Sequence, residues 1–127
     1  MAIPEESQPL IATLKRAAFQ LKETGIPFCL AGGFAVYARG GESVDHDIDF
    51  LIREEDAGRT LTALAEVGFR CEVPPEGWLV KAWRGDVLVD LIYEPRGGPV
   101  TDAWFERSDE LDVYAVTMHW WMRRSAA

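Results

Sequence analysis

Two aspartates separated by a single residue, Asp47 and Asp49, form the part of the sequence best suited to chemistry. They lie in the segment Asp-Ile-Asp-Phe-Leu-Ile, whose alternation of polar and apolar residues predicts a β-strand. Because successive side chains of a strand point to opposite faces, both carboxylates would share one face while Ile48 and Phe50 enter a core. Two neighbouring carboxylates can hold a divalent cation. The alternative is a strand whose charged face only contacts solvent.

A pair of glycines, Gly32 and Gly33, comes shortly before this strand. The pair follows the apolar run Phe28–Ala31 and precedes Phe34–Arg39, which together predict a strand, a tight turn and a short helix. Glycines at a helix N-terminus let phosphate oxygens approach backbone N–H groups, where the helix dipole favours negative charge. The sequence therefore predicts a phosphate-binding turn beside the carboxylate strand. A plain turn that only feeds a helix is the alternative.

A third aspartate, Asp90, lies in the otherwise apolar segment Val87–Tyr93. The dipeptide Gly85-Asp86 is typical of a two-residue hairpin turn, which would pair this segment with Leu79–Arg84 and place Lys81 opposite Asp90. A buried carboxylate without a partner is costly, so Asp90 needs a partner, a metal ion or an opening in the packing. An ion pair with Lys81 is one interpretation. It does not exclude the others, because Lys81 can also contact a phosphate.

Other side chains near these motifs have less specific roles. Asp45 shares the alternation of the strand and is expected at the surface, with a role as an outer metal ligand as the alternative. His46 is expected at a loop edge and not at a metal ion. Several aromatic residues have the chemistry to stack on a base, but aromatics at these spacings are more often core residues: Tyr37, Trp78, Trp83 and Trp104.

The order of these motifs resembles the nucleotidyltransferase superfamily, whose fold is that of DNA polymerase β. The segments Leu-Ala-Gly-Gly-Phe-Ala-Val-Tyr-Ala-Arg-Gly-Gly, starting at Leu30, and Asp-His-Asp-Ile-Asp-Phe, starting at Asp45, carry the similarity. They look most like small bacterial nucleotidyltransferase-like proteins near the aminoglycoside and lincosamide adenylyltransferases. The resemblance extends from about Phe28 to Pro99 and is strengthened by the third aspartate downstream.

The resemblance implies a transfer of a nucleoside monophosphate from a nucleoside triphosphate to an acceptor hydroxyl. In that mechanism Asp47 and Asp49 hold two Mg²⁺ ions, and Asp90 helps bind the second ion and accepts the proton of the attacking hydroxyl. Gly32 and Gly33 would hold phosphate. The sequence does not choose between a small molecule, an RNA end and a protein side chain as acceptor.

A hypothesis of a different class is a non-catalytic nucleotide-binding or interaction module, such as a degenerate nucleotidyltransferase or one half of a toxin–antitoxin pair. Relatives of the resembled kind usually continue into further C-terminal helices. Residues 1–127 are therefore expected to be a single nucleotidyltransferase-like domain without that helical extension. Trp120, Trp121 and Met122 would then cover an apolar patch, either within the chain or across a homodimer.

The composition narrows the class of protein. A length of 127 residues predicts one domain, and the 48% apolar content is ordinary for a globular chain. The net charge of −8 argues against an extended nucleic-acid surface. No apolar run approaches the roughly 20 residues that span a bilayer, and no leader pattern is present, so a cytoplasmic protein without a membrane partner is expected. Cys29 and Cys71 are expected to be buried free thiols.

The elements that would position these residues belong to an α/β fold of the α+β type. It has a mixed sheet of about five strands with helices mainly on one face. Helices are expected at Ser7–Thr24, Phe34–Arg39, Glu55–Val67 and Thr101–Arg107. Strands are expected at Phe28–Ala31, Asp47–Ile52, Phe69–Val73, Leu79–Arg84, Val87–Tyr93 and Leu111–Met118.

Overall fold

A computed structural model describes residues 8–31, 47–95, 98–106, 109–113 and 116–120, the last two segments by their backbone only. Several residues singled out in the sequence lie outside these ranges. They are the glycine pair Gly32 and Gly33, the flanking Asp45 and His46, Tyr37 with its expected helix Phe34–Arg39, and the C-terminal Trp121 and Met122.

The elements within the described residues follow the expected order. The helices are α1 (Gln8–Glu23), α3 (Ala57–Glu66), which follows the 3₁₀ turn η2 (Glu54–Asp56), and α4 (Asp102–Glu106). The strands are β1 (Cys29–Ala31), β2 (Asp47–Leu51), β3 (Arg70–Glu72), β4 (Leu79–Arg84), β5 (Val87–Ile92), β6 (Asp109–Val113) and β7 (Val116–Trp120).

The strands form one mixed sheet with the order β3-β4-β5-β2-β1-β7-β6. The pairs β2–β5 and β1–β7 are parallel, and the other neighbouring pairs are antiparallel. The expected fold class, with a mixed sheet and helices mainly on one face, is confirmed. The sheet has seven strands in the described part of the chain, more than the expected five or so.

The C-terminal hairpin accounts for part of this difference. The prediction of one strand over Leu111–Met118 is wrong, because β6 and β7 pair antiparallel with Val113 opposite Val116. The sequence between Leu111 and Met118 contains no Gly, Pro or Asn to indicate a turn, so its apolar pattern looks continuous. Strand β7 then pairs with β1, which places β1 inside the sheet and not at its edge.

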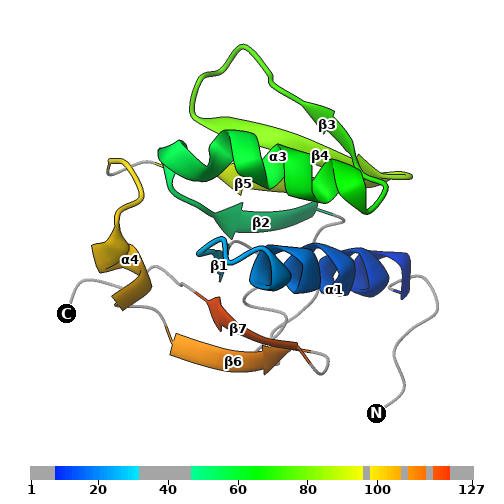
Figure 1. Ribbon diagram of the computed structural model, residues 1–127, viewed down its shortest axis with the longest axis horizontal. Helices are drawn as coiled ribbons and strands as arrows, with labels where there is room; N and C mark the ends of the chain where they lie inside the picture. The colour runs from blue at the N-terminus through cyan, green and yellow to red at the C-terminus, as the bar shows by residue number, and fades with distance from the viewer. Residues whose placement is uncertain (1–7, 32–46, 96–97, 107–108, 114–115, 121–127) are drawn as a thin grey trace.

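Helices α1 and α3 lie together over one face of the sheet (Figure 1). The apolar residues of α1 recur at helical spacing, so Leu14, Ala17 and Leu21 are fully buried against the strands. From the sheet, Ile48 and Phe50 enter the same core, and the ring of Phe50 lies edge-on to Phe28 with centroids 5.1 Å apart. Burial of this apolar face is the main force that holds the sheet and helices together.

The opposite face of the sheet is covered differently. Helix α4 and the preceding Val100 pack over the end of β2 and β5, where they contact Leu51 and Ile92. Cys29 is buried in the same small cluster, whereas Cys71 is partly buried on the helix side. Within the described residues neither cysteine forms a disulfide bond, as expected. Neither α1 nor α3 covers this face, so polar side chains can be placed on it.

Candidate active site

One row of residues crosses five strands in register. Asp49 of β2 lies between Ala31 of β1 and Asp90 of β5. Asp90 in turn lies opposite Lys81 of β4, and Lys81 lies opposite Glu72 of β3. Because paired residues point to the same side of a sheet, this row lies on the face that α1 and α3 leave uncovered.

The pairing of two particular strands brings the aspartates together. Strands β2 and β5 run parallel with Asp49 beside Asp90, and their neighbours Ile48 and Val89 point into the core with no exposure. The hairpin that carries Asp90 has the predicted register, since Arg84 lies opposite Val87 and Lys81 opposite Asp90. A one-residue slip of either strand would turn its aspartate into the core.

The turn of this hairpin explains why the register is fixed. Gly85 adopts a positive φ of 60°, a backbone conformation that glycine enters without the steric cost that other residues meet. The two-residue connection Gly85-Asp86 then sets each pair along β4 and β5. The prediction that Lys81 faces Asp90 is therefore confirmed.

The carboxyl group of Asp90 is perturbed by its surroundings on this face. It is half-buried, and its Oδ1 atom is enclosed without a hydrogen-bond partner in the described residues. Burial is the main cause that raises the pKa of Asp90 above its ordinary value of 3.8, and the negative charges of Asp47 and Glu76 act in the same direction. Lys81 and a hydrogen bond with Asp49 oppose this shift in the pKa. The result is a carboxylate that accepts a proton more readily than an exposed one.

Asp47 lies at the open end of the same strand face. It is exposed, and it pairs with Leu88 of β5, two residues before Asp90. The described residues contain no group of three His, Cys, Asp or Glu side chains already arranged to hold a metal ion. The Asp49–Asp90 pair nevertheless fits Mg²⁺, because its oxygen ligands are those that Mg²⁺ prefers and the partnerless Oδ1 of Asp90 lacks a positive contact.

Trp83 is a candidate for contact with a bound ligand, although the sequence pattern favoured a core position for it. It shares the face of Lys81, two residues away on β4, and lies opposite Leu88. Its Nε1 atom is enclosed and finds no acceptor among the described residues, while the Arg70 guanidinium lies 5.5 Å from the ring centroid. The two-residue spacing between Lys81 and Trp83 was the sequence signal that both side chains share one face of β4. It was ambiguous because strand aromatics are usually packed.

The predicted phosphate-binding glycines lie next in sequence to this row. Gly32 directly follows Ala31, the residue of β1 that pairs with Asp49. Trp78 is 40% exposed near the start of β4, and Trp104 packs in the cluster under α4. The structure thus brings together Asp49, Asp90 and Lys81, with Asp47 at the rim.

Three solved structures share this arrangement of strands and helices. A proposed nucleotidyltransferase from Thermotoga maritima has a TM-score of 0.71 at 15% identity, over 94% of this chain and 79% of that one. ANT(2'')-Ia in complex with adenylyl-2''-tobramycin has a TM-score of 0.67 at 18% identity, over 89% and 69%. The lincomycin-bound lincosamide adenylyltransferase LnuA has a TM-score of 0.58 at 15% identity, over 94% and 81%. The chain has the nucleotidyltransferase fold.

At these identities the likeness establishes the nucleotidyltransferase fold, as the sequence motifs predicted. No protein-family profile and no curated protein matches the sequence. The chain spans 65% of the length of ANT(2'')-Ia in its solution structure. Within the described residues of this nucleotidyltransferase fold, no helix has the length and apolar character to cross a bilayer.

Proposed function

We propose that this protein transfers a nucleoside monophosphate from a nucleoside triphosphate to an acceptor hydroxyl in a Mg²⁺-dependent reaction. The observation that carries the proposal is the side-by-side placement of Asp49 and Asp90 on parallel strands, with Oδ1 of Asp90 enclosed and partnerless in the described residues. The fold supports the same class of reaction, because similar structures include a lincosamide adenylyltransferase and ANT(2'')-Ia with an adenylylated product.

Each aspartate has a distinct proposed role. Asp47 and Asp49 hold Mg²⁺, which when bound neutralises charge on the triphosphate. Asp90 contributes a further ligand oxygen and accepts the proton of the acceptor hydroxyl, a role favoured by its raised pKa. A raised pKa also means that Asp90 must lose its proton before it can act, so the activity should fall as the pH decreases through that pKa.

Cationic and backbone groups complete the proposed site. Lys81 lies opposite Asp90, where its ammonium group stabilises the carboxylate and can bind a phosphate oxygen. Gly32 and Gly33 supply backbone N–H groups to the phosphates. We propose a small hydroxyl compound as acceptor. The bound product or ligand in two similar structures supports this choice, and the net charge of −8 disfavours a large RNA.

Calorimetric titration of ATP and GTP tests the nucleotide site. The wild type should bind in the presence of Mg²⁺ and not in EDTA, and the Asp47→Asn/Asp49→Asn double variant should lose at least about tenfold in affinity. Asp86→Asn is a matched control, because it removes one exposed carboxylate from the turn of the same hairpin. Failure of the wild type to bind either nucleotide up to millimolar concentration would overturn the proposal.

Pyrophosphate release in the presence of a pool of hydroxyl compounds tests the transfer itself. Asp90→Asn should retain nucleotide binding within about tenfold and lose transfer by about 100-fold or more, since the proton acceptor is removed. Equal rates for Asp90→Asn and Asp86→Asn would contradict the role of Asp90.

The second candidate is a non-catalytic nucleotide-binding or interaction module. The lack of a preformed three-carboxylate cluster in the described residues favours it. Binding of ATP or GTP with Mg²⁺ and no pyrophosphate release with any acceptor pool would identify this second function.

A further inference from the structure

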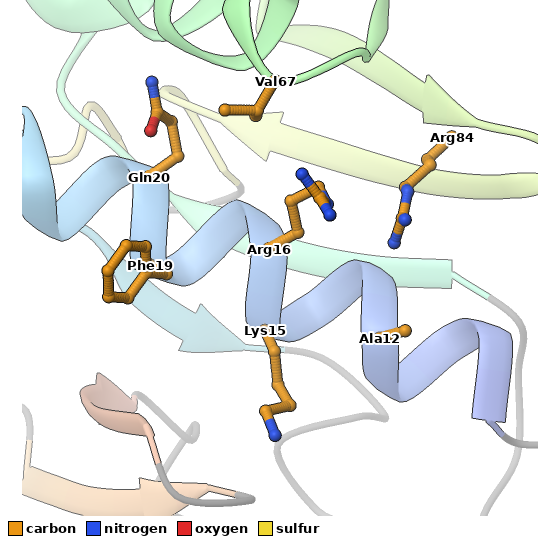
Figure 2. A pocket seen from close by; sticks show the side chains of 7 residues that line it. All are labelled: Ala12, Lys15, Arg16, Phe19, Gln20, Val67 and Arg84. Atoms are coloured by element: carbon orange, nitrogen blue, oxygen red, sulfur yellow. The ribbon is translucent and has the colours of Figure 1, made fainter.

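A pocket of about 580 Å³ lies on the helix side of the molecule, away from the aspartate row. It opens between α1 and the end of the β4–β5 hairpin, with the residue that follows α3 above it (Figure 2). Its volume is within the roughly 300–1,000 Å³ range of small-molecule sites. The lining residues are Ala12, Lys15, Arg16, Phe19, Gln20, Val67 and Arg84.

Two arginines face this space, and no described acidic residue forms an ion pair with either. Figure 2 shows the side chains of Arg16 and Arg84 directed into the gap between α1 and β4, whereas Lys15 points away from it. Within the described residues neither guanidinium forms an ion pair or a side-chain hydrogen bond. Two converging guanidinium groups match the geometry of a carboxylate or a phosphate.

Next to the arginines the pocket wall contains apolar side chains. Phe19 is 59% exposed, and Ala12 and Val67 are the other apolar residues of the lining. Gln20 donates a hydrogen bond from Nε2 to the carbonyl oxygen of Ala63 at 3.0 Å, which ties α1 to α3. The backbone of the wall is therefore in place before a ligand binds, and only the side chains have to be ordered.

We propose that this pocket binds a small organic anion whose carboxylate or phosphate lies between Arg16 and Arg84 and whose apolar part rests on Phe19. The site is separate from the proposed nucleotide site, because Arg84 points to the helix side of the sheet with Val87, its partner in β5. It needs no divalent cation. The ligand class follows from both features together, since the guanidinium pair selects the anionic group and the phenyl ring the apolar one.

The experiment is an amide chemical-shift titration of the ¹⁵N-labelled protein in EDTA, with phenyl phosphate, benzoate, inorganic phosphate and neutral benzyl alcohol as probes. Shifts should concentrate on α1 around Arg16 and on the turn after Arg84, and benzyl alcohol should cause none. Phenyl phosphate binding stronger than benzoate binding would assign a phosphate ligand, and the reverse order a carboxylate. Because EDTA removes the Mg²⁺ that the proposed nucleotide site requires, binding at this pocket is tested independently of nucleotide binding.

Single substitutions locate the contacts. Arg16→Gln and Arg84→Gln should each weaken phenyl phosphate binding by about tenfold, since each removes charge-assisted hydrogen bonds. Lys22→Gln removes the same charge from the exposed surface of α1 outside the pocket and should change the affinity by less than twofold. Phe19→Ala should weaken binding of phenyl phosphate but not of inorganic phosphate.

Two results would overturn the proposal. One is the absence of saturable shifts at the pocket with every anionic probe up to millimolar concentration. The other is an equal loss of affinity in Lys22→Gln and Arg16→Gln, which would indicate that the probes only sense the overall charge of the chain.

Discussion

Asp56 and Asp90 are both withdrawn from solvent, but their carboxylates differ in the hydrogen bonds that they accept. The side chain of Asp56, at the start of α3, is only 4% exposed, and it accepts hydrogen bonds from Arg53 at 2.9 Å and Arg59 at 2.8 Å. Asp90, in the middle of β5, is half-buried and keeps one enclosed oxygen without a partner in the described part of the chain.

This difference separates a structural carboxylate from one available to a ligand. Each oxygen of Asp56 accepts a hydrogen bond from an arginine, so the charge of this carboxylate is already compensated within the protein. Asp90 carries the desolvation cost of a carboxylate without the full set of contacts that would offset it, and its pKa is raised as a result. Unsatisfied polar groups of this kind are often found where a protein binds a ligand.

The largest effect is expected when the satisfied carboxylate is neutralised. Asp56→Asn keeps the shape of the side chain but removes the charge that both arginines contact, so the free energy of unfolding should fall by about 2–3 kcal/mol. Urea denaturation followed by circular dichroism measures this change. Asp86→Asn, at an exposed turn position that accepts Asn, should change the free energy of unfolding by less than about 0.5 kcal/mol.

An effect of Asp56→Asn as small as that of Asp86→Asn would break the comparison. It would mean that Arg53 and Arg59 exchange their bonds to Asp56 for water at no cost. The comparison requires that the paired carboxylate of Asp56 stabilises the fold, so that its removal lowers the free energy of unfolding.

The unsatisfied carboxylate should behave in the opposite way. Asp90→Asn removes a charge that burial disfavours, so at neutral pH the variant should be more stable than the wild type, by on the order of 1 kcal/mol. Such a gain at a functional position is the usual exchange between stability and activity. Thermal unfolding of both proteins in EDTA, where no cation can bind the wild type, gives the comparison.

The pH dependence of this difference has a definite sign. Because the pKa of Asp90 is raised above its ordinary value of 3.8, the folded wild type binds a proton more readily than the unfolded chain. The wild type therefore loses stability relative to Asp90→Asn as the pH rises from the ordinary carboxyl pKa through the raised pKa. Below that range the two proteins should be equally stable. A gap that grows toward low pH would contradict the assignment.

Much of this fold was predictable because local sequence signals agreed with the packing. The spacing of Leu14 and Leu21 identified α1, and Gly85 set the hairpin register that places Lys81 opposite Asp90. The C-terminal hairpin was missed because the residues around Val113 and Val116 carry no turn signal. The pairing of β7 with β1 is a long-range contact that no local pattern encodes.

The candidate site was predictable in its residues but not in its electrostatics. Strand alternation put Asp47 and Asp49 on one face, and family resemblance suggested that Asp90 faces them. Only the parallel pairing of β2 and β5 placed Asp49 and Asp90 side by side, and only three-dimensional packing left the Nε1 of Trp83 enclosed without an acceptor in the described residues. The pocket at Arg16 and Arg84 was not predictable, because its two cations come from segments far apart in the chain.

The smallest expected effect concerns the ion pair between Arg53 and Asp102 of α4. Arg53 also donates a hydrogen bond from its Nη1 atom to Asp102 of α4 at 3.1 Å, but the Asp102 side chain is 73% exposed. An exposed ion pair contributes little to global stability, so Asp102→Asn should lower the melting temperature by no more than about 2 °C.

Local opening should reveal the link that global unfolding does not. Helix α4 has only five residues, and the Arg53–Asp102 contact joins it to the start of α3. Amide hydrogen exchange in α4 should therefore be faster in Asp102→Asn, while exchange in α1 stays unchanged. Asp86→Asn serves again as the control. If α4 exchanges at the wild-type rate in Asp102→Asn, the Arg53–Asp102 contact does not hold α4 in place, and Arg53 acts on the fold through its contacts with Asp56 and Glu55.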